Sequence, residues 1–353
     1  MSGAANGEQS TGAFPARLEA LAQRHYQHRH PFNALLHAGR LGREELRLWF
    51  ANRYHYLTRV PITDALIVAK ADDPAFRRLW VQRLLDHDGW CDPRRADAVA
   101  AAPGEIERWR QLGKALGVTE VELATSARLL PEVRVLCDEY VESVRDADLV
   151  TAVAGTLTDY FASRSSPLPI ELWLRRYPFV EESALARFGR GLAQPAGDAE
   201  FALGFVQRHA TTAELERRCL DAFVTQCVIQ WRLLDAVYLA CRRGQFPRIE
   251  SRAWLMRLSA LAEEDERGRS SAPAVLMLPE RSLQLNRTAY DLLERCDGKH
   301  TLDCIVQELG ERHAAPPGLI ERDIATFVAE LERRSAVSFQ GHPSSGAGEA
   351  RAT

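Results

Sequence analysis

Hydrophobic side chains recur every three or four residues through most of the chain, from about residue 15 to residue 242. A helix would gather on one face the apolar positions of REELRLWFANRYHYL, which are Leu46, Trp49, Phe50 and Leu57. The segment PAFRRLWVQRLLDHDG has the same spacing, with Pro74 in the place of a first-turn residue and Gly89 where a helix ends. No strand-like alternation interrupts the region. The pattern predicts an all-α domain of about seven or eight helices over residues 15–242.

The pattern changes after a short linker at residues 243–253. The segment APAVLMLPERSLQLN holds an apolar run followed by an alternating one, which is typical of a strand or a hairpin. Three short helical patterns follow, with an Asp-Gly turn at 297–298 between the first two. Residues 254–340 are therefore expected to form a small α+β domain. Residues 1–14 and 341–353 are small and polar, and we expect both to be disordered tails.

Composition and charge exclude several classes of protein. Of the 353 residues, 46% are hydrophobic and 26% are charged, as in ordinary soluble globular domains. The net charge of -3 argues against a protein that binds nucleic acid through phosphate contacts. No segment approaches the roughly 18 apolar residues of a membrane helix, and the N-terminus lacks the pattern of a secretory signal. Seven cysteines without a CxxC pair are expected to be free thiols in a cytoplasmic protein.

Two polar residues stand where the helix expected over residues 74–88 should face the core. Phe76, Leu79 and Trp80 form an apolar stripe on that helix. Continuing the stripe by three and by four residues gives Arg83 and then His87. A buried cation is costly unless it is paired, so Arg83 implies a partner such as an anionic ligand.

Arg53 and Tyr140 are also polar residues at core-facing positions, on two other expected helices, because each continues an apolar or aromatic face. Two simpler explanations stay open for Arg83 and His87. Arg83 could pair with an acid on another helix, and the ring of His87 could cap the end of its own helix. Two arginines and two tyrosines on the inner faces of one helical domain, Arg53, Arg83, Tyr56 and Tyr140, nevertheless predict a polar interior, and a ligand site would explain it.

Metal and nucleotide sites are not expected. His25, His28 and His30 lie close together in sequence, but no acidic residue stands at helical spacing and Pro31 follows directly. The chain has no glycine-rich phosphate loop after a strand and no GxSxG elbow.

Several longer stretches resemble the pyrroloquinoline quinone (PQQ) synthase family, PqqC. They include YQHRHPFNALLHAGRL, WFANRYHYLTRVPITDALIV, QRLLDHDG, LPEVRVLCDEYV and DAEFALGFVQRHATT, and the likeness covers residues 15–242. The series LMLPERSLQLNRTAYDLLERCDGKH is similar to PqqD, the small carrier of the precursor peptide, so the chain resembles PqqC–PqqD fusions. The resemblance implies a haem-oxygenase-like helical bundle followed by a winged-helix-like α+β domain. It also implies ring closure and oxidation of the last PQQ precursor by O2, without a metal or an organic cofactor.

The same resemblance implies roles for individual residues. His87 and Tyr140 match catalytic positions of the family, with His87 as the proton shuttle. The implied substrate-binding residues are Tyr26, Arg53, Tyr56, Arg83, Arg187 and Gln226. Arginines suit this task because the substrate carries several carboxylates.

Several positions depart from the family pattern. Ser166 and Pro169 stand where the family has a histidine and an arginine, and neither can replace the lost charge or proton exchange. Arg187, Gly191 and Gln226 stand at the places of a tyrosine, an arginine and a lysine. These changes bear on the reaction and not on the fold.

The implied partners follow from the two domains. The first domain would take the PQQ precursor and form a homodimer, and the second would bind a PqqA-like precursor peptide and a PqqE-like radical SAM maturase. No nucleic acid or membrane partner is expected. Two alternatives stay open: an oxidase acting on another peptide-derived aromatic substrate, and an inactive scaffold that presents a peptide to a radical SAM maturase.

Overall fold

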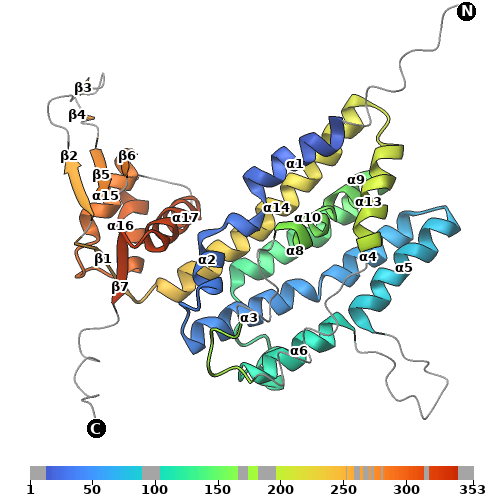
Figure 1. Ribbon diagram of the computed structural model, residues 1–353, viewed down its shortest axis with the longest axis horizontal. Helices are drawn as coiled ribbons and strands as arrows, with labels where there is room; N and C mark the ends of the chain where they lie inside the picture. Colours follow the sequence, from blue (N-terminus) through green and yellow to red (C-terminus); the bar gives the residue numbers. More distant parts are fainter. Residues whose placement is uncertain are drawn as a thin grey trace, which may run out of the picture. The chain divides into compact units, whose positions relative to one another are not determined.

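The chain divides into two compact units, Met1–Leu234 and Asp235–Thr353. The computed structural model describes residues 13–89, 104–165, 174–181, 196–251, 253–257, 263–264, 270–271, 274–279, 281–313 and 318–340. The boundary between the units falls inside one long helix, α14 (Ala213–Arg242), drawn in yellow in Figure 1.

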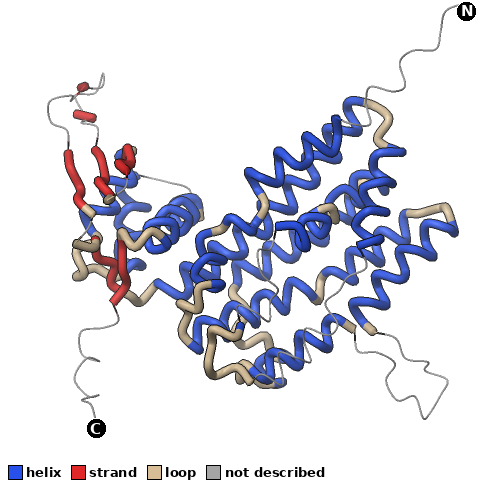
Figure 2. Tube along the Cα trace, in the orientation of Figure 1, coloured by secondary structure: helices blue, strands red, loops and turns tan. Residues whose placement is uncertain are grey.

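The described part of the first unit contains helices and loops only, as Figure 2 shows. The helices are α1 (Ala13–His25), the 3-10 helix η1 (Gln27–Arg29), α2 (Pro31–His37), α3 (Arg43–Leu57), α4 (Val60–Lys70), α5 (Pro74–Asp88), α6 (Glu105–Ala115), α7 (Glu120–Ala124), α8 (Pro131–Asp146), α9 (Leu149–Gly155), α10 (Thr158–Ser165), α13 (Ala196–His209) and α14. The all-α prediction is confirmed, although the helices are shorter and more numerous than the periodicity indicated.

One helix break that the pattern did not predict separates α9 from α10, in a stretch where the pattern predicts a single helix. The amides of Thr156 and Leu157 bond to carbonyls three residues back, which tightens the turn at the end of α9. The Thr156 hydroxyl donates to the Val153 carbonyl at 2.8 Å and so competes with the backbone hydrogen bonds that would continue the helix. The break starts α10 anew, and its second residue is Asp159.

Helix α5 has the bounds that its local signals predict. Asp73 accepts a hydrogen bond from the Ala75 amide at 2.8 Å, Pro74 opens the first turn, and Gly89 ends the helix with a φ of 81°. The inward stripe of Phe76, Trp80, Arg83 and His87 is buried as expected. Leu79 is an exception, because its side chain is 53% exposed. At 100° per residue it falls on the edge of the stripe and not at its centre.

Helix α4 is surrounded by other helices, since it packs against α5, α8, α9 and α3. Helix α6 in turn packs against α5 and α3. On another side of the bundle α1 runs along α14, and Arg17 of α1 pairs with Glu216 at 2.6 Å (Figure 1). Polar side chains of α4 and of the inward faces of α5 and α8 are therefore held inside the unit.

The second unit combines short strands with three helices. Its elements are β1 (Phe246–Ile249), β2 (Trp254–Arg257), β3 (Glu263–Glu264), β4 (Ser270–Ser271), β5 (Ala274–Leu278), β6 (Arg281–Leu285), α15 (Arg287–Arg295), α16 (Leu302–His313), α17 (Leu319–Arg333) and β7 (Val337–Gln340). Antiparallel strands form a sheet in the order β2-β5-β6, and β3 pairs with β4. The expected hairpin is β5–β6, and Gly298, with a φ of 78°, makes the expected turn between α15 and α16. The α+β prediction is confirmed.

Residues 246–249 form a strand within the stretch expected to be a linker. Strand β1 pairs with β7, with Phe246 opposite Gln340 and Ile249 opposite Val337. The partner lies near the other end of the unit, so a local pattern could not reveal it. Pro247 is compatible with this strand because its backbone faces away from β7, where its carbonyl accepts a hydrogen bond from the Gly298 amide at 3.0 Å, so the pairing with β7 needs no amide proton from it.

A buried ion pair holds the end of α14 within the second unit. Arg242 donates from Nε and Nη2 to the two carboxylate oxygens of Glu332, each at 3.0 Å. The Tyr238 hydroxyl lies 3.0 Å from the same carboxylate. All three side chains are buried, so the last turns of α14 belong to the core of this unit.

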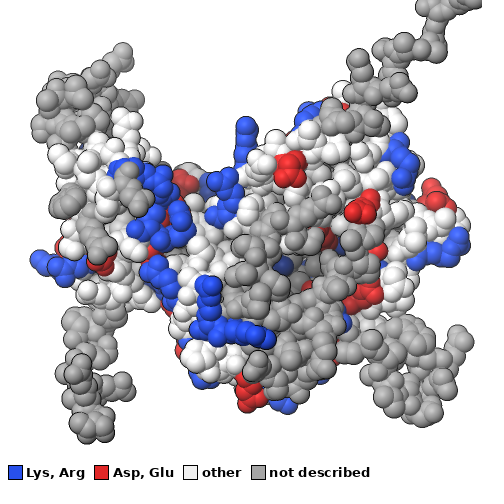
Figure 3. All heavy atoms as spheres, viewed as in Figure 1, with Lys and Arg blue, Asp and Glu red and all other residues white. Residues whose placement is uncertain are grey.

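The surface and the thiols agree with the composition. Acidic and basic side chains are interspersed over the visible face of the first unit (Figure 3). Among the described helices, none is both long enough and apolar enough to cross a membrane. The cysteines that the structure describes carry free thiols, and Cys91 lies outside the described residues.

Candidate functional site

A carboxylate is buried on an otherwise apolar helix. Asp64 lies in the middle of α4 and has no exposed surface. Its Oδ1 atom accepts hydrogen bonds from Trp80 Nε1 at 2.9 Å and from Arg83 Nε at 3.3 Å. Arg83 also donates from Nη2 to Asp159 Oδ2 on α10 at 2.9 Å. Arg83 is therefore a buried cation paired with acids on two other helices, which is the first of the simpler explanations that the sequence left open.

His87 stands one turn further along α5, between two carboxylates. Its Nδ1 atom lies 3.0 Å from Glu105 Oε2, and its Nε2 atom lies 3.9 Å from Asp64 Oδ2. Glu105 is the first residue of α6 and accepts a hydrogen bond from Trp109 Nε1 at 3.2 Å. The ring of His87 thus contacts another helix, which differs from the capping role that the sequence also allowed.

Gly104 explains how the end of α5 and the start of α6 come so close. A Cβ atom at this position would lie 2.4 Å from the His87 carbonyl oxygen and 2.2 Å from the Gly89 nitrogen. Only glycine fits such an approach of two backbones. The residue directly after it is Glu105, so the close approach places this carboxylate beside His87. We call Asp64, Arg83, His87, Glu105 and Asp159 the Arg83 cluster.

The carboxylates of the cluster decide the charge on His87. Burial pushes the pKa of His87 down, but the contact with Glu105 and the charges of Glu105 and Asp64 outweigh it and raise the pKa above its ordinary value of 6.5. Burial raises the pKa of Glu105, but the contact with His87 outweighs it and leaves the pKa below its ordinary value of 4.5. Burial raises the pKa of Asp64 in spite of Arg83 and His87. His87 is therefore held toward the imidazolium form, which can donate a proton.

Two phenols stack next to the cluster. The rings of Tyr56 on α3 and Tyr140 on α8 lie 5.3 Å apart at an angle of 20°. Gln230 on α14 donates to the Tyr56 hydroxyl at 2.8 Å, and the Thr63 hydroxyl lies 2.9 Å from that of Tyr140. Burial raises the pKa of both tyrosines, so both stay neutral hydrogen-bonding groups at ordinary pH.

Arg53 lies against one of the stacked tyrosines, and Tyr26 interacts with Asp159 of the Arg83 cluster. The guanidinium of Arg53 lies 5.0 Å from the centre of the Tyr56 ring. Within the described part of the chain, no carboxylate lies at ion-pair distance from Arg53. Tyr26 is buried against Phe161, and its pKa is raised by burial and then by the charge of Asp159. Arg53 is therefore a cation still available to an anionic ligand.

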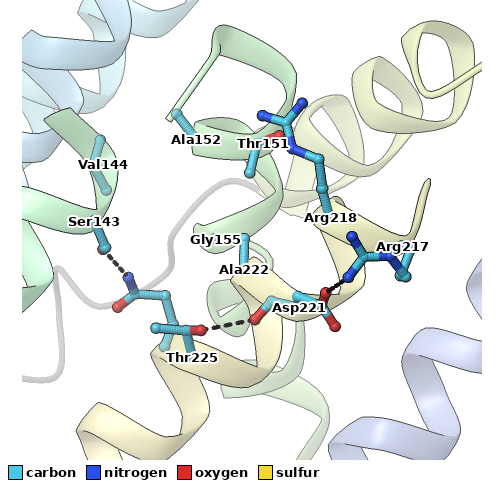
Figure 4. A pocket seen from close by; sticks show the side chains of 11 residues that line it. Ser143, Val144, Thr151, Ala152, Gly155, Arg217, Arg218, Asp221, Ala222 and Thr225 are labelled. Atoms are coloured by element: carbon cyan, nitrogen blue, oxygen red, sulfur yellow. Dashed lines mark hydrogen bonds and ion pairs between the residues drawn. The ribbon is translucent and has the colours of Figure 1, made fainter. Parts of the chain in front are cut away.

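Gln226 lines a separate pocket of about 300 Å³ between α8, α9 and the first half of α14. Its Nε2 atom donates to Ser143 Oγ at 2.9 Å, and in Figure 4 this bond is the dashed line that starts at the labelled Ser143. Arg217 and Asp221 pair at 2.6 Å on the same wall, and both are labelled in Figure 4. Gln226 stands one helical turn before Gln230, so the pocket lies one turn along α14 from the stacked tyrosines.

The structure brings most of the expected site residues together. Those that meet at or next to the Arg83 cluster are Tyr26, Arg53, Tyr56, Arg83, His87 and Tyr140. Gln226 does not meet them directly and faces Ser143 instead. Arg187, together with Ser166, Pro169 and Gly191, lies outside the described residues.

Sequence reasoning missed the acids of the cluster. A signal for Asp64 existed, because it is the one charged residue in the apolar run VPITDALIVA. Glu105 and Asp159 carry no such signal, since acids in a first helical turn are common on any helix. Gln230 was overlooked because an amide on a long helix is unremarkable in a sequence.

The arrangement can bind an anion and supply protons. Arg53 offers a cation with no acid at ion-pair distance among the described residues, and His87 offers a proton within the same helical unit. Among the described residues, no group of three His, Cys, Asp or Glu side chains could hold a metal ion. The donor set is that of an acid–base and anion-binding site.

Family models match both units. Residues 16–236 match a model described as the TENA/THI-4/PQQC family, and residues 274–337 match coenzyme PQQ synthesis protein D (PqqD). The chain is 33% identical to the bifunctional coenzyme PQQ synthesis protein C/D of Methylorubrum extorquens, over 90% of this chain and 92% of that protein. It is 38% identical to the pyrroloquinoline-quinone synthase of Acidiphilium cryptum, over 64% of this chain and 88% of the relative.

One solved structure supports the fold of the first unit, and a second is reported for comparison only. A TenA homologue from Pseudomonas syringae pv. tomato aligns with a TM-score of 0.50 at 12% identity, covering 66% of this chain and 97% of that one. A Shewanella denitrificans domain described as having a heme oxygenase-like fold aligns with a TM-score of 0.48 and covers 67% of this chain and 94% of that one. At such identities the first likeness concerns the fold alone.

Proposed function

The chain belongs to the TENA/THI-4/PQQC family and carries a PqqD domain after it, and from this premise we propose that it acts in PQQ biosynthesis as the synthase of the last step. The reaction is the O2-dependent ring closure and oxidation of the last PQQ precursor. One observation carries the proposal: the likeness to a bifunctional PQQ synthesis protein C/D runs through nearly the whole of both chains. Relatives named pyrroloquinoline-quinone synthase support the same activity for the first unit.

The Arg83 cluster and the stacked tyrosines suit this chemistry. The precursor carries several carboxylates, and Arg53 supplies a cation that has no acid at ion-pair distance among the described residues. The reduced precursor itself supplies the electrons, and each O2 takes two electrons and two protons to become H2O2. His87, held toward imidazolium, is the proton donor in this scheme, and Tyr140 lies within the same buried group of polar side chains. No metal or organic cofactor enters the scheme.

The second unit supports a role in peptide handling. The PqqD match begins at β5 and ends at the start of β7, so it spans the hairpin and all three helices. We propose that this unit binds a PqqA-like precursor peptide and meets a PqqE-like radical SAM maturase. We also propose that the first unit forms a homodimer, as the family resemblance implies.

The test of the synthase function is a turnover assay with the full chain. The purified protein is mixed with the PQQ precursor without oxygen, and O2 is then admitted. We expect the absorbance of PQQ to appear together with H2O2. A chain that binds the precursor tightly but forms no PQQ, or that does neither, contradicts the proposed reaction.

A second candidate keeps the fold and changes the substrate. It is favoured by the replacement of a family lysine with Gln226, whose amide is bonded to Ser143. Oxidation of another peptide-derived aromatic compound, with no turnover of the PQQ precursor, would support this candidate. Binding of the precursor peptide with no oxidase activity on any such compound would instead identify an inactive scaffold.

A further inference from the structure

We propose that Asp64 is a positioning residue of the oxidase site: its Oδ1 atom holds Arg83, and its Oδ2 atom keeps a proton on Nε2 of His87. The role in oxidation rests on the proposed function. The proton on His87 does not, because it is a property of the unliganded protein. Nothing in the resemblance to the family assigns a role to Asp64.

The two oxygens of Asp64 have different surroundings. Oδ1 accepts from Trp80 Nε1 and from Arg83 Nε. Oδ2 is shielded from solvent and accepts no hydrogen bond from the described residues. A buried carboxylate oxygen without a donor is costly. The Nε2 atom of His87 lies 3.9 Å from it, close enough for a small movement of the ring to complete the bond.

Both nitrogens of the His87 ring therefore face carboxylates. A neutral imidazole would turn a lone pair toward either Glu105 at 3.0 Å or Asp64 at 3.9 Å. The imidazolium form avoids this on both sides, because it carries a proton on each nitrogen.

Other charged groups surround Asp64 and His87, and they do not cancel the preference of His87 for its protonated form. The charged groups that act on His87 or Asp64 are Arg83 on α5, Glu105 on α6, Asp159 on α10 and Asp198 on α13; Asp86 acts on Asp198, and Arg53 on Glu105. Arginine charges oppose a proton on His87, whereas the carboxylates favour it. Asp64 and Glu105 are the carboxylates within 4 Å of the ring among the described residues.

The consequence for oxidation concerns one proton. As O2 is reduced to H2O2, the His87 imidazolium gives one proton to the reduced oxygen and becomes a neutral imidazole. Its lone pair then faces Asp64 Oδ2, which favours the uptake of a new proton from solvent. Asp64 stays paired with Arg83 in this step and acts through His87 and not on the substrate.

The substitution Asp64→Asn tests the proposal. Asparagine keeps an oxygen for Trp80 and Arg83 but can place an N–H group toward His87. We expect the titration midpoint of His87, followed by NMR of 15N-labelled histidine in the full chain, to fall by about one pH unit. Asp159→Asn is the matched control, because Asp159 also pairs with Arg83 but makes no contact with His87. Its effect should be less than half as large.

The wild type provides a measurement that needs no variant. At pH 7, both 15N shifts of His87 should be those of a ring protonated in more than half of the molecules. A mainly neutral ring, or equal shifts in Asp64→Asn and Asp159→Asn, would overturn the proposal even if Asp64→Asn folds poorly.

Turnover separates this proposal from the synthase function. In an active protein, Asp64→Asn should move the alkaline limb of the kcat/KM profile to lower pH by the same amount as the NMR midpoint. If the chain makes no PQQ while the NMR result holds, the proposed function fails and the proton assignment to His87 stands. If PQQ is made and the limb does not move, the positioning role of Asp64 fails.

Discussion

Replacing His87 with glutamine lowers kcat/KM for the PQQ precursor by about 10²- to 10⁴-fold, the range typical of a lost general acid. Glutamine keeps a polar side chain near Glu105 but carries no transferable proton at neutral pH. The loss should fall mainly on kcat, because the available cation for binding is Arg53. Steady-state assays of PQQ formation at saturating O2 measure both parameters.

A matched control for this variant is His209→Gln. His209 is exposed at the end of α13, and its ring lies against Phe205 and contacts no residue of the Arg83 cluster in any ring contact or ion pair of the described chain. It should leave kcat/KM unchanged. An activity of His87→Gln within about threefold of the wild type would be too small an effect for a general acid and would remove His87 from the proton-donor role.

The substitution Arg83→Met destabilises the first unit by about 3–5 kcal/mol, as expected when one partner of a buried ion pair is removed. Asp64 then stays in the core with one hydrogen bond, from Trp80, and without its cation. Urea unfolding followed by tryptophan fluorescence measures the loss, since Trp80 lies beside Asp64.

Arg110→Met is the control for this change. Arg110 pairs with Glu107 and Glu120 on the surface, and such pairs contribute about 0–1 kcal/mol. Adding Asp64→Asn to Arg83→Met should restore part of the stability, because the uncompensated charge is gone. If Arg83→Met costs no more than Arg110→Met, the cluster does not hold the bundle together.

The sequence predicted what depends on local signals. Pro74 and Gly89 bound their helix by backbone chemistry alone, so its limits could be stated in advance. The need of Arg83 for a partner could also be inferred, because a helical stripe placed a cation in the core. The family likeness then indicated which of the inward polar residues share one site.

The sequence could not predict the contacts that depend on which helices and strands become neighbours in the folded chain. The contact of His87 with Glu105 requires the close approach of two backbones at Gly104, across a stretch that the structure does not describe. The direction of Gln226 depends on its bond to Ser143 of α8, which its position on α14 does not reveal. Pairing of β1 with β7 is likewise set by tertiary packing.

In our proposal, the Arg83 cluster and the residues next to it form the place where PQQ is made and held. Adding PQQ to the 15N-histidine-labelled full chain tests this most directly, with the His87 signals assigned from His87→Gln. We expect those signals to move as PQQ binds, in parallel with the change in PQQ absorbance, while the signals of exposed His209 stay in place. Binding of PQQ that leaves His87 unmoved, or no binding at all, would contradict the account.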